Sequence, residues 1–256
     1  MGVQLISQTA NYEDVATSLV IPVMTGLIGA YVFKSTNAGR NLVNGGVVAE
    51  TVGTQTQKST YGQSASANAY IDSKIDLNSM GEYTLVAVCD KPTTLSSGYA
   101  TNILGTYESY LSNGSRSAGR GIFFSGSVLY SQFVYYSDAN VIASAPLSLP
   151  VVDMSNRGVY AARIQKLSAT SVRNTLNNLT SGASRTIAAT NVFTTNVGTG
   201  STMKITHEAD VSTNTQTYSS AAYVALIYNR ALTDAELQEV HLWINKYCSD
   251  RGITLG

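Results

Sequence analysis

Two carboxylates, Glu208 and Asp210, stand two residues apart in a stretch that reads as the end of a strand. Side chains alternate along a strand, so both would point to one face. Paired carboxylates on one face are what a glycosidase uses, one as acid and one as base or nucleophile. The alternative is a solvated strand end, which we favour, so we expect no catalytic residues and no enzymatic activity.

Residues that ligate metals are scattered along the chain. His207 and His241 stand alone, whereas a zinc site needs several such ligands together. Calcium needs several converging oxygens, and no acidic calcium loop is present. We therefore expect no metal site and no cofactor, although a structural calcium stays an alternative. The single acidic residues considered for it are Asp72, Asp76, Asp138, Asp153 and Asp210.

Cys89 and Cys248 are the two cysteines of the chain. Cys89 ends an apolar run and Cys248 falls on an expected helix. Two cysteines make no disulfide framework, and no CxxC spacing occurs. Buried free thiols are the favoured interpretation, with a single tertiary disulfide as the alternative.

Aromatic and amide side chains gather in residues 98–121. Aromatic rings stack on the C–H faces of sugars, while amides read the hydroxyls. We expect a glycan-contacting loop or hairpin here, and residues 128–136 add further tyrosines, Tyr130 among them. The alternative is that these tyrosines are half-buried strand residues or subunit contacts. The candidate ligand residues are Tyr107, Tyr110, Asn113 and Arg116, in a segment that also holds Tyr99 and Arg120.

The 256 residues carry 16 basic and 16 acidic side chains, so the formal net charge is zero and charged residues are 12% of the chain. Nucleic-acid binding needs a basic excess, and membrane-surface binding needs a polybasic patch. We expect neither partner. The apolar stretch 19–30 is too short to span a bilayer, and we expect no signal peptide. A surface with so few ions favours self-assembly or docking on a larger assembly.

Short apolar segments separated by turn signals every eight to twelve residues predict an antiparallel β-sandwich or barrel. We expect an N-terminal arm over residues 1–25, whose β-prone part 19–23 would pair with a neighbour's sheet edge or form a first strand of the same domain. The sandwich is expected over 26–256. The predicted strands are 27–33, 47–49, 69–72, 83–89, 102–107, 120–124, 128–136, 158–167, 171–176, 203–205 and 221–228, with a loop over 53–68.

A single helix is predicted over 233–250. Thr233 and Glu236 have the spacing of a capping box, in which each side chain bonds the backbone N–H of the other. Apolar residues then recur at intervals of three and four, which defines one buried stripe. Gly252 is a plausible terminator. The stripe consists of Leu237, Val240, Ile244 and Tyr247.

Three segments resemble the concanavalin A-like lectin/glucanase fold in its laminin-G-like branch. They are residues 25–33 with 41–46, residues 69–72 with 83–88, and residues 222–236, which read AYVALIYNRALTDAE and are the most specific. The resemblance implies a jelly-roll sandwich. Enzymes of this fold carry a Glu-x-Asp-x-x-Glu strand, but the last carboxylate is replaced here by Thr213, so the resemblance implies no catalysis.

The low charge and the abundance of Ser, Thr, Asn, Tyr and Gly, taken with this fold resemblance, are similar to what is found in tailed-phage virion proteins. We therefore expect a non-enzymatic virion protein, either a tail fibre or spike tip or a capsid decoration, assembled in the host cytoplasm and acting at the virion surface. The expected partners are other copies, other virion proteins and a surface glycan. The alternatives are a carbohydrate-binding lectin module and a glycoside hydrolase of the same fold.

Overall fold

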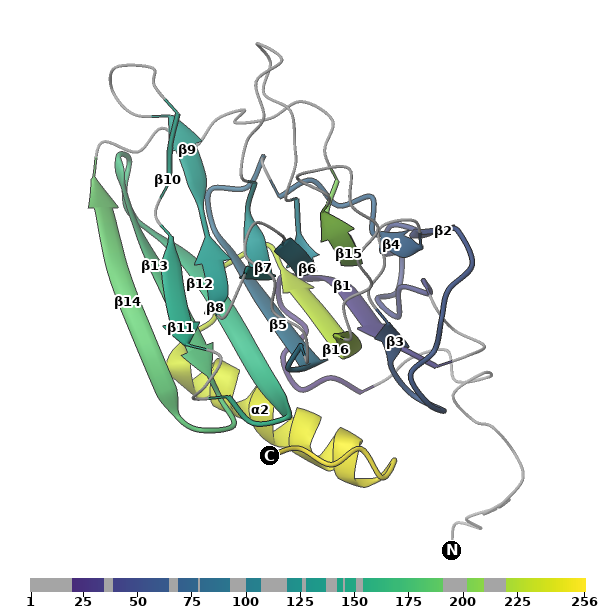
Figure 1. Cartoon of the computed structure of the whole chain (residues 1–256). Coiled ribbons are helices and arrows are strands. Elements are labelled where there is room, and N and C mark those ends of the chain that lie inside the picture. Colours follow the sequence, from purple (N-terminus) through teal and green to yellow (C-terminus); the bar gives the residue numbers. More distant parts are fainter. Residues whose placement is uncertain are drawn as a thin grey trace, which may run out of the picture.

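The computed structural model describes residues 20–34, 39–64, 69–77, 79–92, 100–106, 119–125, 128–136, 142–144, 146–150, 154–190, 202–209 and 220–256. These residues form two antiparallel sheets and a helix near the C-terminus (Figure 1). The predicted all-β sandwich with a C-terminal helix is thereby confirmed. The four candidate ligand residues, Tyr107, Tyr110, Asn113 and Arg116, lie outside the described residues.

Sheet A has the strand order β1-β16-β5-β12-β13-β14, and β3 also pairs with β16. Its strands are β1 (Leu27–Val32), β3 (Gln63–Ser64), β5 (Tyr83–Asp90), β12 (Arg157–Ser168), β13 (Ser171–Asn178), β14 (Ala183–Thr190) and β16 (Ala221–Tyr228). The central strands β5 and β16 are buried along their whole length. They therefore read as continuous apolar runs, the pattern of a strand covered on both faces.

Sheet C has the order β11-β8-β7-β6-β15-β4-β2 and faces one side of sheet A. Its strands are β2 (Glu50–Val52), β4 (Tyr70–Asp72), β6 (Ala100–Gly105), β7 (Gly121–Ser125), β8 (Val128–Gln132), β11 (Leu147–Pro150) and β15 (Lys204–Ala209). A separate two-stranded antiparallel sheet pairs β9 (Val134–Tyr136) with β10 (Ile142–Ser144).

Two hydrophobic clusters lie on the two faces of sheet A. The first fills the space between the sheets and includes Cys89. The second lies between the outer face of sheet A and helix α2 (Asp234–Ser249), and includes Cys248. Both cysteines are buried and free, as predicted, and they lie on opposite faces of the sheet. Ile21 and Val23, from the segment predicted to be an arm, are also buried in the second cluster.

Helix α2 begins as the sequence predicts. The Thr233 side chain accepts from the backbone N–H of Glu236, and the Glu236 carboxylate accepts from the Thr233 backbone N–H, which completes the capping box. The four stripe residues Leu237, Val240, Ile244 and Tyr247 are buried. Gly252 follows the helix with φ +66°, a left-handed conformation that suits glycine.

Several strands differ from the sequence prediction. The segment 47–49 is not a strand, and Val47 and Val48 are 49% and 83% exposed. The neighbouring strand is β2 instead. The predicted strand 128–136 is interrupted at Phe133, which turns into the core between β8 and β9. Within the expected loop 53–68 the short strand β3 forms. Strands β10, β11 and β14 were not predicted.

Candidate functional site

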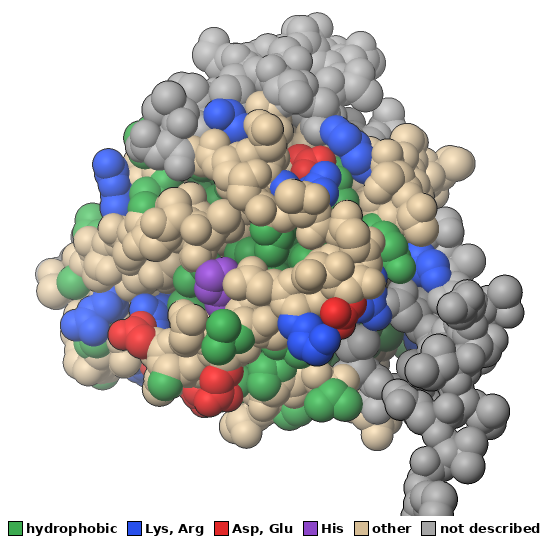
Figure 2. Space-filling model, turned by 90° about the horizontal axis from the view of Figure 1, so that it is seen from below, with side chains coloured by type: hydrophobic (Ala, Val, Ile, Leu, Met, Phe, Trp, Pro, Cys, Tyr) green, Lys and Arg blue, Asp and Glu red, His purple; other side chains and the backbone are tan. Residues whose placement is uncertain are grey.

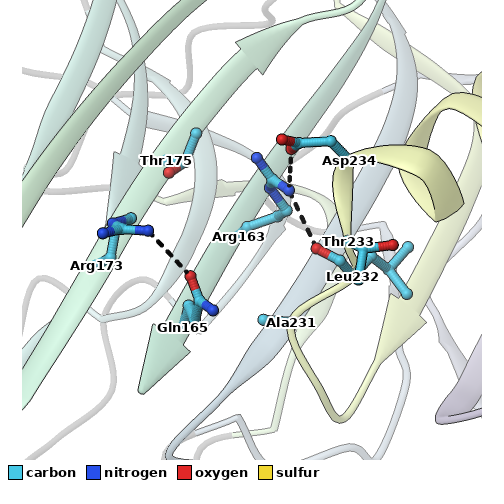
Figure 3. A pocket seen from close by; sticks show the side chains of 8 residues that line it. All are labelled: Arg163, Gln165, Arg173, Thr175, Ala231, Leu232, Thr233 and Asp234. Carbon is cyan, nitrogen blue, oxygen red and sulfur yellow. Dashed lines mark hydrogen bonds and ion pairs between the residues drawn. The ribbon is translucent and has the colours of Figure 1, made fainter. Parts of the chain in front are cut away.

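A cavity of about 290 Å³ opens on the outer face of sheet A, beside the start of helix α2 (Figure 3). We call it the Arg163 pocket. Strand β12 contributes Arg163 and Gln165, and strand β13 contributes Arg173 and Thr175. The connection from β16 to α2 closes it with Ala231, Leu232, Thr233 and Asp234.

The register of the β12–β13 hairpin places the two arginines together. Arg163 is directly opposite Thr175, and Gln165 is directly opposite Arg173. Directly paired residues of antiparallel strands share a face, so all four side chains lie on the outer face and the arginines are diagonal neighbours. Two guanidinium groups therefore line one small cavity.

The charges in the pocket are unequal. Nη1 of Arg163 lies 2.6 Å from Oδ1 of Asp234 and also donates to the Leu232 carbonyl at 3.1 Å. Nη1 of Arg173 makes a long bond of 3.4 Å to Oε1 of Gln165 (Figure 3). Two cations thus face one carboxylate among the residues that line the pocket. The local excess of one positive charge favours a ligand with a single negative charge.

The start of the helix is fixed by residues outside the pocket. Arg230 donates from Nη2 to Oε1 of Glu236 at 2.6 Å and from Nη1 to Oε2 at 2.9 Å. These bonds, together with those from Thr233, lower the pKa of Glu236 to about 2. Thr84 of β5 holds the same connection, because its hydroxyl donates to the Arg230 carbonyl and accepts from the Leu232 N–H, each at 2.9 Å. These hydrogen bonds hold the wall of the pocket in place.

On the other side of the molecule, sheet C carries an aromatic pair. Tyr130 stacks on Phe123 with ring centroids 5.4 Å apart, and Phe123 is paired across the strands with Asn102. Tyr130 is half-buried and Phe123 and Asn102 are buried. The alternative interpretation of these tyrosines, as half-buried strand residues, thus describes Tyr130.

Arg120, grouped with the aromatic segment in the sequence, is a structural residue. Its side chain is fully buried, where it donates to the carbonyls of Leu77 and Met80 at 2.7 Å each and lies 4.4 Å from the centre of the Phe133 ring. Burial lowers the pKa of Arg120 to about 10. The carbonyl partners are about 40 residues earlier in the chain, so no local sequence pattern predicts that Arg120 is a buried structural residue.

The acidic residues considered for calcium do not converge in the described part of the chain. No group of three or more His, Cys, Asp or Glu side chains suited to a metal ion occurs among those residues. Asp72 instead accepts from Lys74 and Thr202. Burial alone would raise the pKa of Asp72, but these hydrogen bonds outweigh it and lower the pKa. Asp138, Asp153 and Asp210 lie outside the described residues.

The candidate catalytic strand is only partly placed. Glu208 lies in β15 at the register position opposite Thr101.

Among the described residues, no helix is long and apolar enough to cross a membrane. His241, on α2, faces Asn245 at 3.2 Å, and burial lowers its pKa.

No family model and no curated protein matches the sequence. Solved structures do match. The botulinum neurotoxin serotype C1 binding domain aligns with a TM-score of 0.57 and 8% identity over 83% of this chain and 50% of that one. The binding domain of botulinum neurotoxin DC in complex with SialylT gives 0.54 and 9% over the same shares. The likeness shows a shared β-sandwich fold. The chain spans about half the length of these neurotoxin domains.

A sialidase from Trypanosoma rangeli, solved in complex with 2,3-difluorosialic acid, also aligns, with a TM-score of 0.52 and 15% identity. This alignment covers 87% of the present chain but 34% of the sialidase chain. At such identities the sandwich is what these proteins have in common with this one, and the residues of the Arg163 pocket have to be judged by their own chemistry.

Arg163 and Arg173 were not predicted as site residues from the sequence. A signal was present, because the predicted strands 158–167 and 171–176 are separated by only a few residues, which is the spacing of a hairpin. Once a hairpin is assumed, two arginines ten positions apart fall near each other. What the pattern does not contain is the helix start, which comes from residues 231–234 and turns an arginine pair into a cavity.

Proposed function

We propose that the chain is a non-enzymatic, glycan-binding β-sandwich on the surface of a phage virion, and that the Arg163 pocket holds an acidic sugar. The observation that carries the binding role is the set of groups in this pocket. Arginine binds carboxylates in a forked geometry, and Gln165 and the Asp234 carboxylate suit sugar hydroxyls. Ala231, which is half-buried, supplies apolar surface against which a sugar ring rests.

The pocket is suited to binding and not to cleavage. Most glycoside hydrolases cleave the bond with two carboxylates that flank it, and sialidases use a tyrosine nucleophile; no tyrosine is among the described residues that line this pocket. Among the residues that line the pocket, Asp234 is the one carboxylate, and it is paired with Arg163. Bound structures of the fold neighbours, with SialylT and with 2,3-difluorosialic acid, are in keeping with a carbohydrate ligand.

The virion part of the proposal rests on composition. The face seen in Figure 2 consists mostly of backbone, uncharged polar side chains and hydrophobic side chains, with small groups of acidic and basic side chains among them. Such a surface suits repeated contacts between subunits, since little like-charge repulsion opposes them. If the chain is part of a virion, an antibody against it should label intact particles in electron microscopy, and mass spectrometry of purified particles should detect it. Particles that are not labelled and do not contain the chain would refute this location.

The binding role is tested by calorimetry with short oligosaccharides of glucuronic acid and with their neutral glucose counterparts. We expect the acidic ligand to bind more tightly. Arg173→Ala removes one charged hydrogen-bond donor, about 1.5–3 kcal/mol, which corresponds to roughly a 10- to 100-fold weaker affinity. Arg173 is exposed, and its hydrogen bond to the Gln165 side chain is long, so the fold should be unaffected.

Arg185→Ala is the matched control. Arg185 is an exposed arginine of the same sheet, but it is paired with Leu176, whose side chain lies in the cluster between the sheets, so it belongs to the other face. The control should bind like the unmodified chain. Equal affinity for acidic and neutral sugars, or an Arg173→Ala variant that binds normally, would contradict the assignment of this pocket.

A further inference from the structure

Strand β14 is the last strand of sheet A, and it is exposed. It pairs with β13 through all eight of its residues without a shift in register, and it has no neighbour in the described sheet on its other side. Seven of its eight residues are exposed, and Ala189 is half-buried. Figure 1 shows β14 as a long straight strand at the outer edge of the fold.

The sequence of β14, ASRTIAAT, has few of the features that usually protect a sheet edge. Natural edges are blunted by Lys, Pro, a bulge, a very short strand or an inward-pointing charge. β14 contains one charge, Arg185, and neither Lys nor Pro, and its pairing is regular. It also exposes Ile187, which is 40% accessible. An edge of this length that carries a single charge, Arg185, is a template for a further strand.

We propose that β14 pairs antiparallel with β14 of a second copy, about a twofold axis that passes through Ile187. The geometry selects this register. The twofold axis of such a pair stands perpendicular to the sheet, so the outer face of one copy continues as the outer face of the other. Directly opposite residues must then share a face, which restricts the axis to a residue position and excludes a position between two residues.

Charge and apolar contact together select among the remaining registers. An axis at Arg185 sets the two arginines directly opposite each other, and an axis at Thr186 leaves them as diagonal neighbours. An axis at Ile187 sets Arg185 opposite the partner's Ala189 and packs Ile187 on the partner's Ile187. Like charges across strands destabilise a pair, whereas β-branched pairs stabilise it. The Ile187 axis removes the exposed aliphatic side chain from water and separates the arginines.

The pairing has a consequence for the Arg163 pocket, and this step rests on the proposed function. The pocket lies between β12 and β13 on the outer face, and Thr175 in its wall bonds Thr186 of β14 at 3.1 Å. In the paired sheet both pockets open on one face. Four strand spacings separate them, about 19 Å at ~4.8 Å each. Two pockets on one face let the dimer bind a densely glycosylated surface bivalently.

Sedimentation velocity of the full chain at tens of micromolar tests the pairing. We expect a dimer for the unmodified chain and a monomer for Ile187→Lys, which sets two like charges against each other on the axis. Leu167→Lys is the control, because Leu167 is 43% exposed on β12, away from the edge. It should stay dimeric. A monomeric unmodified chain, or an Ile187→Lys variant that sediments as a dimer, would overturn the proposal.

The register is tested by cross-linking. Ile187→Cys should form a covalent dimer under mild oxidation, whereas the buried Cys89 and Cys248 should not, and Leu167→Cys should stay monomeric on a reducing-agent-free gel. Absence of the covalent Ile187→Cys dimer would overturn the twofold axis at Ile187. A circular-dichroism spectrum confirms that each variant is folded.

Glycan binding is measured separately, so that the two proposals fail independently. Ile187→Lys should bind a soluble glucuronic acid oligosaccharide with unchanged affinity but should bind a surface densely coated with the same sugar at least tenfold more weakly. Failure of the pocket assignment abolishes both signals and leaves sedimentation unchanged. An equal affinity of dimer and monomer for the coated surface would overturn the bivalent arrangement.

Discussion

Thr84 is a single buried hydroxyl that holds the connection between β16 and helix α2. It lies in β5, donates to the Arg230 carbonyl and accepts from the Leu232 N–H, each at 2.9 Å. Thr84→Val keeps the shape of the side chain and removes both bonds. The two backbone groups are then left without their partner next to a cavity wall, and Leu232 also accepts the bond from Arg163. The variant therefore tests stability and the pocket together.

The magnitude follows from the two unpaired groups. Each costs about 1–3 kcal/mol, while the added methyl group recovers about 1 kcal/mol. We expect a net loss of about 3 kcal/mol, or roughly 6–12 °C in Tm for a chain of this size. Thr84→Ser is the control, since it keeps the hydroxyl and loses one methyl group, for about 1 kcal/mol.

Urea unfolding followed by circular dichroism measures both variants, and calorimetry with the acidic oligosaccharide measures the pocket. The valine variant should be the less stable of the two and should bind more weakly. If Thr84→Val is as stable as Thr84→Ser, the hydroxyl does not hold this connection and the reasoning fails.

Three further outcomes are expected. Val240→Asp places an unpaired charge in the cluster beneath α2 and should cost about 3 kcal/mol or more, whereas Leu242→Asp, on the same helix but 59% exposed, should stay within about 0.5 kcal/mol in the same urea titration. The folded-state pKa of Glu236, about 2, lies below its usual 4.5, so its contribution to stability is complete above pH 4.5 and is lost as the pH falls toward 2; Glu236→Gln should flatten the acid limb of a stability profile measured across that window. Incubation with bacterial surface polysaccharides should release no reducing ends, and turnover that disappears in Glu208→Gln would overturn the non-enzymatic proposal.

The parts of the fold that a local pattern encodes were predictable. The helix could be read from Thr233 and Glu236 because a capping box involves residues three apart, and its buried side from the spacing of Leu237 and Val240. The buried strands β5 and β16 could also be predicted, because each is a continuous run of apolar residues.

Features that depend on distant partners were not predictable. Strand β14 has no apolar alternation, since its sequence is polar and small, and it is a strand because β13 offers it a complete ladder. Val47 and Val48 have high strand propensity but find no covering surface and stay exposed. Arg120 is buried because carbonyls from Leu77 and Met80 meet it across the fold. The Arg163 pocket likewise needs both a hairpin and a helix start.

The position of β16 in sheet A affects how the chain folds during synthesis. β16 lies between β1 and β5, and β1 has no other partner in the described sheet. Strand β1 is made among the first described residues, and β16 among the last. Most strands of the sandwich therefore leave the ribosome before β16 is made, and β16 is the strand that links β1 to the rest of the sheet. The apolar faces of β1 and β5 stay open to solvent over that interval, so chaperones that hold extended apolar segments should increase the soluble yield, and contacts so distant in sequence should make folding slow.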